Sequence, residues 1–255
     1  MTTHSNSLKD KVFLVTGAAR RVGSIIVRTL HANGANILLH FRSSKNDADH
    51  LKNELECQRK DSVSLIKADF DQPRAFEQVA KQALTWGRID GLVNNASSFF
   101  PTPIGSINEE NWDQLINPNL KIPLFLSQAL APELKKSNGC IVNIVDIHAE
   151  RPLKNHAVYC AAKAGLVMLT KSLACDLGPE VRVNAVAPGA ILWPERISDE
   201  DTLNDAAKQT IMSRTFLKRQ GTPEDIASAV LYFMKDAHYV TGQILAVDGG
   251  RSQNS

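Results

Sequence analysis

The sequence predicts an α/β fold, a single Rossmann-type domain with a doubly wound parallel sheet. Short apolar runs alternate with longer amphipathic stretches, as strands and helices do in sheets with right-handed crossovers. Several of these runs are apolar on consecutive positions, as expected of strands that helices cover on both faces. No linker rich in proline, glycine or serine interrupts the alternation, so residues 1–255 are expected to form one domain.

The elements follow in order along the chain. Strands are expected at 11–16, 35–41, 62–68, 89–95, 140–145, 181–187 and 243–248. Helices are expected at 21–33, 46–60, 73–86, 109–136, 157–177 and 223–235. Only residues 188–222 depart from this alternation of strands and helices. The segment is polar, weakly periodic and too long for an ordinary connection. Because it follows the end of a strand, we expect it to be a substrate lid.

The composition excludes several kinds of partner. The 29 basic and 27 acidic residues nearly balance and are scattered, which argues against nucleic acid and anionic membrane surfaces. The first residues are polar, and no apolar run approaches the roughly 18 residues of a membrane-spanning helix. The four cysteines show no CxxC pairing and no metal-ligand spacing with histidine. We therefore expect a cytoplasmic protein without a metal site.

The segment TGAARRVG at 16–23 follows the first strand and opens the first helix, which is the context of a dinucleotide-binding turn. Gly17 permits the tight turn, and Gly23 permits close packing of the helix on the sheet. The N–H groups at the start of the helix would then face a pyrophosphate. Arg21 stands where the middle glycine is usual, preceded by Arg20. The alternative is an ordinary strand-to-helix turn with two solvated arginines.

The end of the second strand indicates which dinucleotide binds. An NAD enzyme normally carries Asp or Glu there, which binds the ribose 2′-hydroxyl. Here the residues are Arg42, Ser43 and Ser44, and the next carboxylate, Asp47, is expected in the following helix. A guanidinium and two hydroxyls suit a 2′-phosphate, so NADPH is the predicted cofactor. The alternative is that Arg42 is merely a charged strand end.

Two further strand ends carry candidate cofactor residues. Asp69 could meet the adenine amino group, whereas its neighbour Asp71 could be the N-cap of the helix that begins near Pro73. Asn95 could lock the neighbouring loop through its side chain, and the small Ala96 would let the backbone approach the cofactor.

Tyr159 and Lys163 lie four residues apart, on one face of an expected helix. A nearby ammonium favours the phenolate, so Lys163 is expected to lower the pKa of Tyr159 and make it a usable proton donor. The alternative is a surface tyrosine with a solvated lysine.

Together these motifs resemble the short-chain dehydrogenase/reductase family, from about residue 11 to 250. The matching segments are TGAARRVG (16–23), NNA (94–96), Asn119 after Trp112, YCAAK (159–163), VRVNAVAPG (181–189) and VTGQILAVDGG (240–250). The resemblance implies that Tyr159 is the proton donor, that Lys163 binds the nicotinamide ribose and that Asn119 holds a proton-relay water. It also implies that Val22, Pro188 and Gly189 contact the cofactor, and that the chain forms a homotetramer.

One position departs from the family pattern. Asp146 lies 13 residues before Tyr159, where the family usually has a serine that holds a substrate carbonyl. A carboxylate is a poor partner for a carbonyl oxygen, since both are acceptors, but a good partner for ring N–H and amino groups. The departure therefore indicates a nitrogen heterocycle as substrate.

That pattern resembles the pteridine reductases. The loop NNASSFFPTP (94–103) is similar to their substrate loop, in which the aromatic residue after two serines stacks on the pterin. The resemblance gives that role to Phe99, gives Ser97 contacts with pterin and cofactor, and brings Arg21 to both. The alternative for Phe99 and Phe100 is an exposed or core aromatic pair.

The sequence thus predicts NADPH-dependent reduction of a pterin such as biopterin, dihydrobiopterin or a dihydrofolate-type substrate. The rival interpretations are a 3-oxoacyl or sugar carbonyl reductase and a non-catalytic NADPH sensor. Leu192 and Trp193 could wall the pterin pocket or pack in the core, and His148 and His156 are expected to be solvated loop residues. Arg251 is a C-terminal arginine, of a kind that reaches the active site of a neighbouring subunit in some pteridine reductases.

Overall fold

The computed structural model of the chain describes residues 7–191 and 205–254. Within these residues, seven strands form one parallel sheet in the order β3-β2-β1-β4-β5-β6-β7. The strands are β1 (Val12–Val15), β2 (Asn36–Phe41), β3 (Val63–Lys67), β4 (Gly91–Asn94), β5 (Cys140–Ile144), β6 (Arg182–Pro188) and β7 (Ile244–Val247). The predicted Rossmann-type sheet is confirmed. The strand order reverses between β1 and β4, and such switch points are where open α/β sheets bind ligands.

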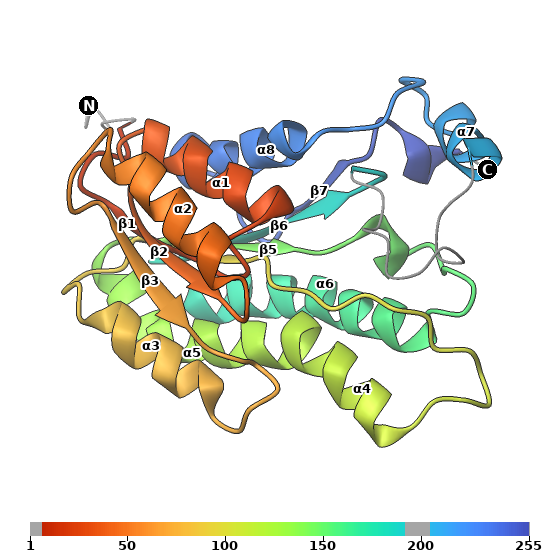
Figure 1. The fold of residues 1–255 in the computed structure, drawn as a ribbon, viewed down its shortest axis with the longest axis horizontal. Coiled ribbons are helices and arrows are strands. Elements are labelled where there is room, and N and C mark those ends of the chain that lie inside the picture. Colours follow the sequence, from red (N-terminus) through yellow and green to blue (C-terminus); the bar gives the residue numbers. More distant parts are fainter. Residues whose placement is uncertain (1–6, 192–204, 255) are drawn as a thin grey trace.

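Helices cover both faces of the sheet (Figure 1). On one face lie α1 (Arg21–Ala32), α2 (Lys45–Glu56) and α8 (Pro223–Lys235), and on the other lie α3 (Ala75–Leu84), α5 (Ile122–Lys136) and α6 (Ala157–Leu177). Each face has its own apolar core, one around Phe13 and Phe233 and the other around Leu14 and Leu126. Because adjacent residues of β1 point into opposite cores, all four of its residues are buried. This explains why the run is apolar at consecutive positions.

The expected helix at 109–136 is divided in three. It consists of α4 (Glu109–Ile116), a π-helical turn η1 (Asn117–Lys121) and α5. Pro118 and Pro123 lack the N–H groups that regular α-helical bonding would use on either side of this turn. π-Helical turns are often found at functional sites, and this one carries Asn119.

The helix α6 is an exception to the expectation that no segment is long and apolar enough to cross a membrane. An 18-residue window of its 21 residues has a mean hydropathy of 1.3, which meets that criterion by length and composition. In this fold, however, α6 packs beside β6 and buries Tyr159, Lys163 and Leu166. Core helices have the same composition, so the helix gives little reason to expect a membrane protein.

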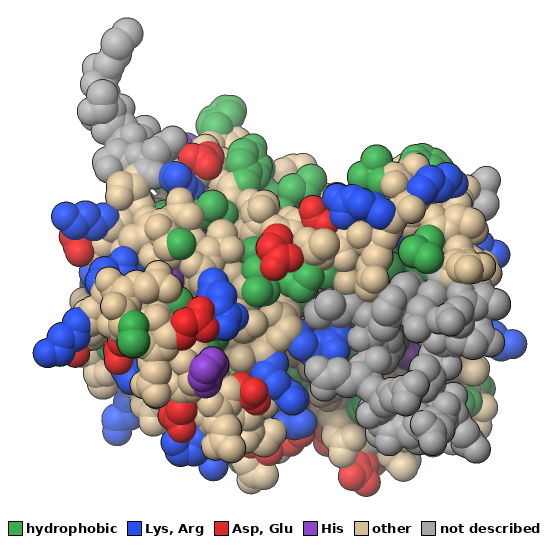
Figure 2. All heavy atoms as spheres, turned by 45° about the horizontal axis from the view of Figure 1, so that its top comes forward, with side chains coloured by type: hydrophobic (Ala, Val, Ile, Leu, Met, Phe, Trp, Pro, Cys, Tyr) green, Lys and Arg blue, Asp and Glu red, His purple; other side chains and the backbone are tan. Residues whose placement is uncertain are grey.

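On the face shown in Figure 2, acidic and basic side chains lie interspersed over α1, α2 and α8. The C-terminal turn η4 (Arg251–Gln253) lies beside α7 (Asp205–Ser213), where Asn254 donates a hydrogen bond to the Arg214 carbonyl at 2.8 Å.

Candidate active site

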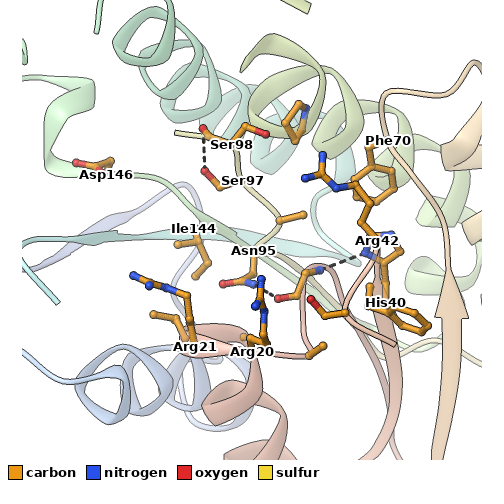
Figure 3. A pocket seen from close by; sticks show the side chains of 18 of the residues that line it. Arg20, Arg21, His40, Arg42, Phe70, Asn95, Ser97, Ser98, Ile144 and Asp146 are labelled. Carbon is orange, nitrogen blue, oxygen red and sulfur yellow. Dashed lines mark hydrogen bonds between the residues drawn. The ribbon is translucent and has the colours of Figure 1, made fainter. Parts of the chain in front are cut away.

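A cavity of about 480 Å³ opens at the carboxyl ends of the central strands. Its wall contains all of the residues predicted to bind the cofactor, together with Asp146. The predicted residues are Gly17, Arg20, Arg21, Val22, Arg42, Ser43, Ser44, Asp69, Asn95, Ala96, Ser97, Tyr159, Lys163, Pro188 and Gly189. Figure 3 shows Arg42 and His40 on one side of it and Asp146 and Ile144 on the other. Residues far apart in the sequence therefore share one site, as the topology requires.

The glycine turn is tight for the reasons that the sequence indicates. Gly17 has a φ of +61°, and a Cβ there would lie 2.9 Å from the Ala96 Cα. A Cβ on Gly23 would lie 2.3 Å from the Gly17 carbonyl oxygen. The Asn95 side chain donates to the carbonyls of Thr16 and Gly17 at 2.8 and 3.0 Å, so it does lock the neighbouring loop.

Arg21 is the first residue of α1 and adopts a φ of +53°. This left-handed conformation suits the glycine that is usual here and costs a residue with a Cβ about 1 kcal/mol. The chain therefore holds an arginine against its backbone preference, in the wall of the cavity. Such strain often accompanies function.

The corner formed by the ends of β2 and β3 is basic, with nearby carboxylates. The Arg42 guanidinium lies 3.5 Å from the Asp71 carboxylate, and that of Arg20 lies 3.9 Å from Asp47, which is in α2 as expected. Burial and the charge of Asp69 raise the pKa of Asp71, whereas Arg42 lowers it.

The prediction that Asp71 is a helix N-cap is wrong. The N-cap of α3 is Arg74, in a left-handed conformation and without a side-chain cap. The backbone N–H of Asp71 instead donates to the Asp69 carboxylate at 3.1 Å, which closes a turn before the helix begins.

Among the described residues that line the site, one buried titratable side chain was not singled out by the sequence analysis. His40 lies in β2, is 2% exposed and contributes to the cavity wall beside Phe70, whose ring stacks on the imidazole. A histidine inside the otherwise apolar run at 37–41 was the signal that could have found it.

The Tyr159 hydroxyl donates a hydrogen bond to Asp146 Oδ2 at 2.7 Å. Asp146 Oδ1 accepts from the His148 backbone N–H at 2.8 Å, and Asp146 thereby caps the short 3-10 helix η2 (Ile147–Ala149). Lys163 Nζ donates to the Ile144 carbonyl at 2.9 Å and lies 5.8 Å from the centroid of the Tyr159 ring. Asp146, Tyr159 and Lys163 therefore form one contiguous cluster.

The electrostatics of this cluster differ from the prediction. Burial raises the pKa of Tyr159 well above its ordinary value, and the charge and hydrogen bond of Asp146 raise it further. Burial lowers the pKa of Lys163 to about 8, against which Asp146 raises it. The prediction that Lys163 lowers the pKa of Tyr159 is therefore wrong, because desolvation and the adjacent carboxylate dominate. They keep the phenol protonated, which is the form that can donate a proton.

The Asn119 side chain is fully buried behind the cavity wall. Its amide nitrogen donates to the carbonyls of Ser98 and Leu115 at 2.8 and 2.9 Å, and its oxygen accepts from the Ser97 hydroxyl at 2.7 Å. This side chain therefore positions the loop that holds Ser97. The water-holding role remains a prediction.

Phe99 and Phe100 have different environments. Phe100 packs against the cluster of Leu115, Val158 and Tyr159, whereas Phe99 is 46% exposed. The Phe99 ring stacks on His156 with a centroid separation of 4.6 Å and meets Tyr159 edge-on at 4.8 Å. His156 is therefore a packing partner of Phe99, which corrects its expected role as a solvated loop residue.

Other predicted features are only partly described. Leu192 and Trp193 lie outside the described residues, as does part of the expected lid. Arg251 of this same chain is half-buried, and burial lowers its pKa while the charges of Asp146 and Asp248 raise it. Among residues 7–191 and 205–254, no group of three or more His, Cys, Asp or Glu side chains is arranged to hold a metal ion.

The chain matches known proteins over nearly its whole length. A family model described as enoyl-(acyl carrier protein) reductase matches residues 17–252. The chain is 37% identical over 248 residues to the 3-oxoacyl-(acyl-carrier-protein) reductase FabG of Thermotoga maritima, covering 95% of this chain and 98% of that protein. It is 30% identical over 251 residues to the 7alpha-hydroxysteroid dehydrogenase of Bacteroides fragilis, covering 96% and 95%.

A solved structure agrees. The blue fluorescent protein from a metagenomic library, in complex with NADPH, superposes with a TM-score of 0.88 at 34% identity, covering 96% of this chain and 99% of that chain. The sheet order, the glycine turn and the pairing of Tyr159 with Lys163 accord with these matches. The chain belongs to the short-chain dehydrogenase/reductase family of oxidoreductases.

Proposed function

We propose that this chain is an NADPH-dependent reductase that reduces a ring C=N bond of a pterin, such as biopterin, dihydrobiopterin or a dihydrofolate-type substrate. The observation that carries the proposal is the Asp146 carboxylate, hydrogen-bonded to the Tyr159 hydroxyl at 2.7 Å. In this position a serine is usual in the family, and a carboxylate selects a substrate edge that donates hydrogen bonds.

The choice of NADPH rests on the end of β2. Arg42, Ser43 and Ser44 line the cavity there, together with Arg20. The ion pairs of Arg42 and Arg20 are more than half exposed on the arginine side, and such pairs contribute about 0–1 kcal/mol. A doubly charged 2′-phosphate can therefore replace them, with stronger hydrogen bonds from the guanidinium groups. The similar blue fluorescent protein was solved with NADPH.

The remaining cavity residues suit the other parts of that cofactor. The turn at Gly17 and the start of α1 would face the pyrophosphate, Asp69 the adenine amino group and Lys163 the nicotinamide ribose. When bound, the reduced nicotinamide supplies the hydride. Arg21, in the same wall, would contact cofactor phosphate and substrate.

Tyr159 would donate the proton, because burial and Asp146 keep its hydroxyl protonated. The hydride would reach a ring carbon while the Tyr159 proton reaches the adjacent ring nitrogen, so the C=N bond becomes CH–NH. Asp146 would orient both partners, since its oxygens retain lone pairs beside those used by His148 and Tyr159. Phe99 is 46% exposed and stacks on His156 outside the residues that line the cavity, and its ring would stack on a pterin that extends beyond them.

A carbonyl reductase is the second candidate, and the named relatives favour it. They include 3-oxoacyl reductases and a hydroxysteroid dehydrogenase, whose names describe carbonyl and hydroxyl chemistry. In that case Tyr159 would protonate a carbonyl oxygen, but that oxygen and the Asp146 oxygens are hydrogen-bond acceptors and do not suit one another at close range. The Asp146 position therefore favours the pterin over the ketone.

A steady-state substrate panel separates these candidates. The purified protein with NADPH is offered biopterin, dihydrobiopterin, dihydrofolate and dihydromonapterin, and in parallel a 3-oxoacyl thioester and a set of ketones. We expect kcat/KM for at least one pterin to exceed that for every ketone. Turnover of ketones alone would establish the carbonyl reductase instead. Light scattering of the same preparation tests the proposed homotetramer.

A further inference from the structure

The cavity wall contains a buried imidazole to which neither the proposed chemistry nor the phosphate contacts assign a task. His40 lies two residues before Arg42, between the strands β1 and β3, and 2% of it is exposed. Buried histidines are usually retained where both ring nitrogens have partners. In His40, both ring nitrogens have a partner.

The hydrogen bonds of His40 fix its tautomer. The Gly17 backbone N–H donates to His40 Nδ1 at 3.2 Å, so Nδ1 has to be the unprotonated acceptor. The proton therefore lies on Nε2, which donates to the Ala68 carbonyl at 3.2 Å. Burial lowers the pKa of His40 to about 4, so the ring remains neutral at ordinary pH and keeps both bonds.

These two bonds join the two walls of the adenosine half of the cavity. Gly17 belongs to the turn that would face the pyrophosphate, whereas Ala68 precedes Asp69 at the end of β3, where the adenine would lie. Phe70 covers the imidazole, with ring centroids 4.3 Å apart and planes 16° apart. Figure 3 shows His40, Phe70 and Arg42 grouped on this side of the pocket.

We propose that His40 is a positioning residue for the adenosine 2′-phosphate half of NADPH, which sets the separation between the Gly17 turn and the Ala68–Phe70 wall. The inference rests on the proposed cofactor but not on the proposed substrate. It predicts an effect on cofactor affinity and none on the reaction at saturating cofactor.

Two substitutions test the two hydrogen bonds of the imidazole separately, because each keeps one bond and removes the other. In His40→Asn, the amide oxygen can occupy the place of Nδ1 and keep the Gly17 bond, while the donor to Ala68 is lost. In His40→Gln, the amide nitrogen can occupy the place of Nε2 and keep the Ala68 bond, while the acceptor for Gly17 is lost. His40→Leu removes both bonds at similar volume.

The matched control is His31, a second buried histidine, in α1 and outside the cavity wall. It is 3% exposed, and its Nε2 lies 2.8 Å from the Ser62 hydroxyl. His31→Leu therefore removes a buried imidazole of similar exposure, on the other face of the sheet, without touching the proposed cofactor site.

The test measures the Kd of NADPH and of adenosine 2′,5′-bisphosphate by fluorescence and calorimetry, with the melting temperature of each variant. We expect both Kd values to rise about 30-fold in His40→Leu and about fivefold in His40→Asn and His40→Gln, since each net hydrogen bond is worth about fivefold in affinity. At saturating NADPH, kcat should stay within twofold of the wild type. His31→Leu should lower the melting temperature and leave both Kd values unchanged.

Unchanged Kd values in His40→Leu, or equal weakening in His31→Leu, would overturn the inference. If His40→Leu does not fold, the Asn and Gln variants decide in the same way. If the wild type binds neither NADPH nor the bisphosphate, the cofactor proposal fails along with this one, whereas tight binding by wild type and His40→Leu alike refutes only the role of His40.

Discussion

The two ends of the cavity are built by different means. At the cofactor end, regular strands stop beside a glycine turn, where the backbone of Gly17 approaches Ala96 closely and the Asn95 and His40 side chains bond to the backbone of the turn. At the substrate end, irregular loops are held by side chains, as Asn119 holds Ser97 and Ser98 and Tyr159 contacts Asp146. Proteins can therefore share the first end across a family, whereas a few substitutions change the second.

This difference explains why membership of the family does not identify the substrate. The matched relatives are 30–37% identical to this chain and cover it nearly completely, and the structure solved with NADPH superposes on it with a TM-score of 0.88. The proposed substrate depends on a single position, Asp146, and whole-chain identity gives such a position no special weight. Substitutions at the two ends should therefore change different quantities, and the largest expected effect is on kcat.

Replacement of Tyr159 by phenylalanine removes the proton donor and should lower kcat about 10³-fold, within the range for general acids. The Kd of NADPH should change less than twofold, because the aromatic ring and Lys163 remain. Stopped-flow single turnovers measure the first quantity and fluorescence titration the second. A loss of kcat smaller than tenfold would show that another group supplies the proton.

Replacement of Arg42 by alanine acts on the other end. It should lower the ratio of kcat/KM for NADPH to that for NADH by about 10- to 100-fold, since a charge-assisted contact to phosphate is lost. Lys45→Ala is the control, because it removes an exposed positive charge three residues away that pairs with Asp49. An equal change in both variants would reduce the role of Arg42 to general charge.

The pH dependence of kcat/KM for NADPH should report the loss of the Lys163 ammonium group. Burial disfavours its ammonium form, so its pKa lies at about 8. Above that pH the ammonium is lost, and kcat/KM for NADPH should fall about tenfold per pH unit. Tyr159, with a pKa well above its ordinary value, stays protonated throughout. A profile that remains flat to pH 10 would contradict this order, and Lys163→Arg should displace the decline to higher pH.

The same shift has a consequence for stability, with a defined sign. Between about pH 8 and 10.5 an unfolded chain binds the Lys163 proton while the folded chain does not. Folding stability from this residue therefore rises with pH over that interval and is least below pH 8. The dependence of unfolding free energy on pH, compared with Lys163→Met, checks the sign.

The smallest effect concerns Arg21 and its left-handed backbone. Arg21→Gly should raise the free energy of unfolding by about 1 kcal/mol, because glycine adopts this φ without strain. Arg21→Ala keeps the strain and loses the guanidinium, so it should weaken NADPH binding like Arg21→Gly but without the gain in stability. Urea denaturation measures the difference. Equal stability of the two variants would show that the conformation stores no strain.

Much of the fold follows from the sequence alone, because hydrophobic periodicity reports the sheet and its covering helices. The bounds of α6 and α8 agree with the predicted helices residue for residue. The cofactor wall was also predictable, since parallel strand ends meet at one edge and the residues there can be read in order.

The other features of the site could not be predicted, because they depend on the three-dimensional environment of their residues. His40 lies within an apolar strand, and nothing in its neighbours along the chain shows that Gly17 and Ala68 bond to its ring. The raised pKa of Tyr159 follows from burial, which the spacing to Lys163 does not report. Phe99 and Phe100 are adjacent and chemically identical, yet only their packing shows which one faces outward.

We propose above that Asp146 selects a ring that donates hydrogen bonds. Its most direct test is kcat/KM for dihydrobiopterin in wild type and Asp146→Ser, with NADPH affinity as the control. We predict that the substitution lowers this kcat/KM about 100-fold, since a charged acceptor beside the reacting atoms is lost, and that the Kd of NADPH changes less than twofold. Unchanged turnover of dihydrobiopterin in Asp146→Ser would contradict the account.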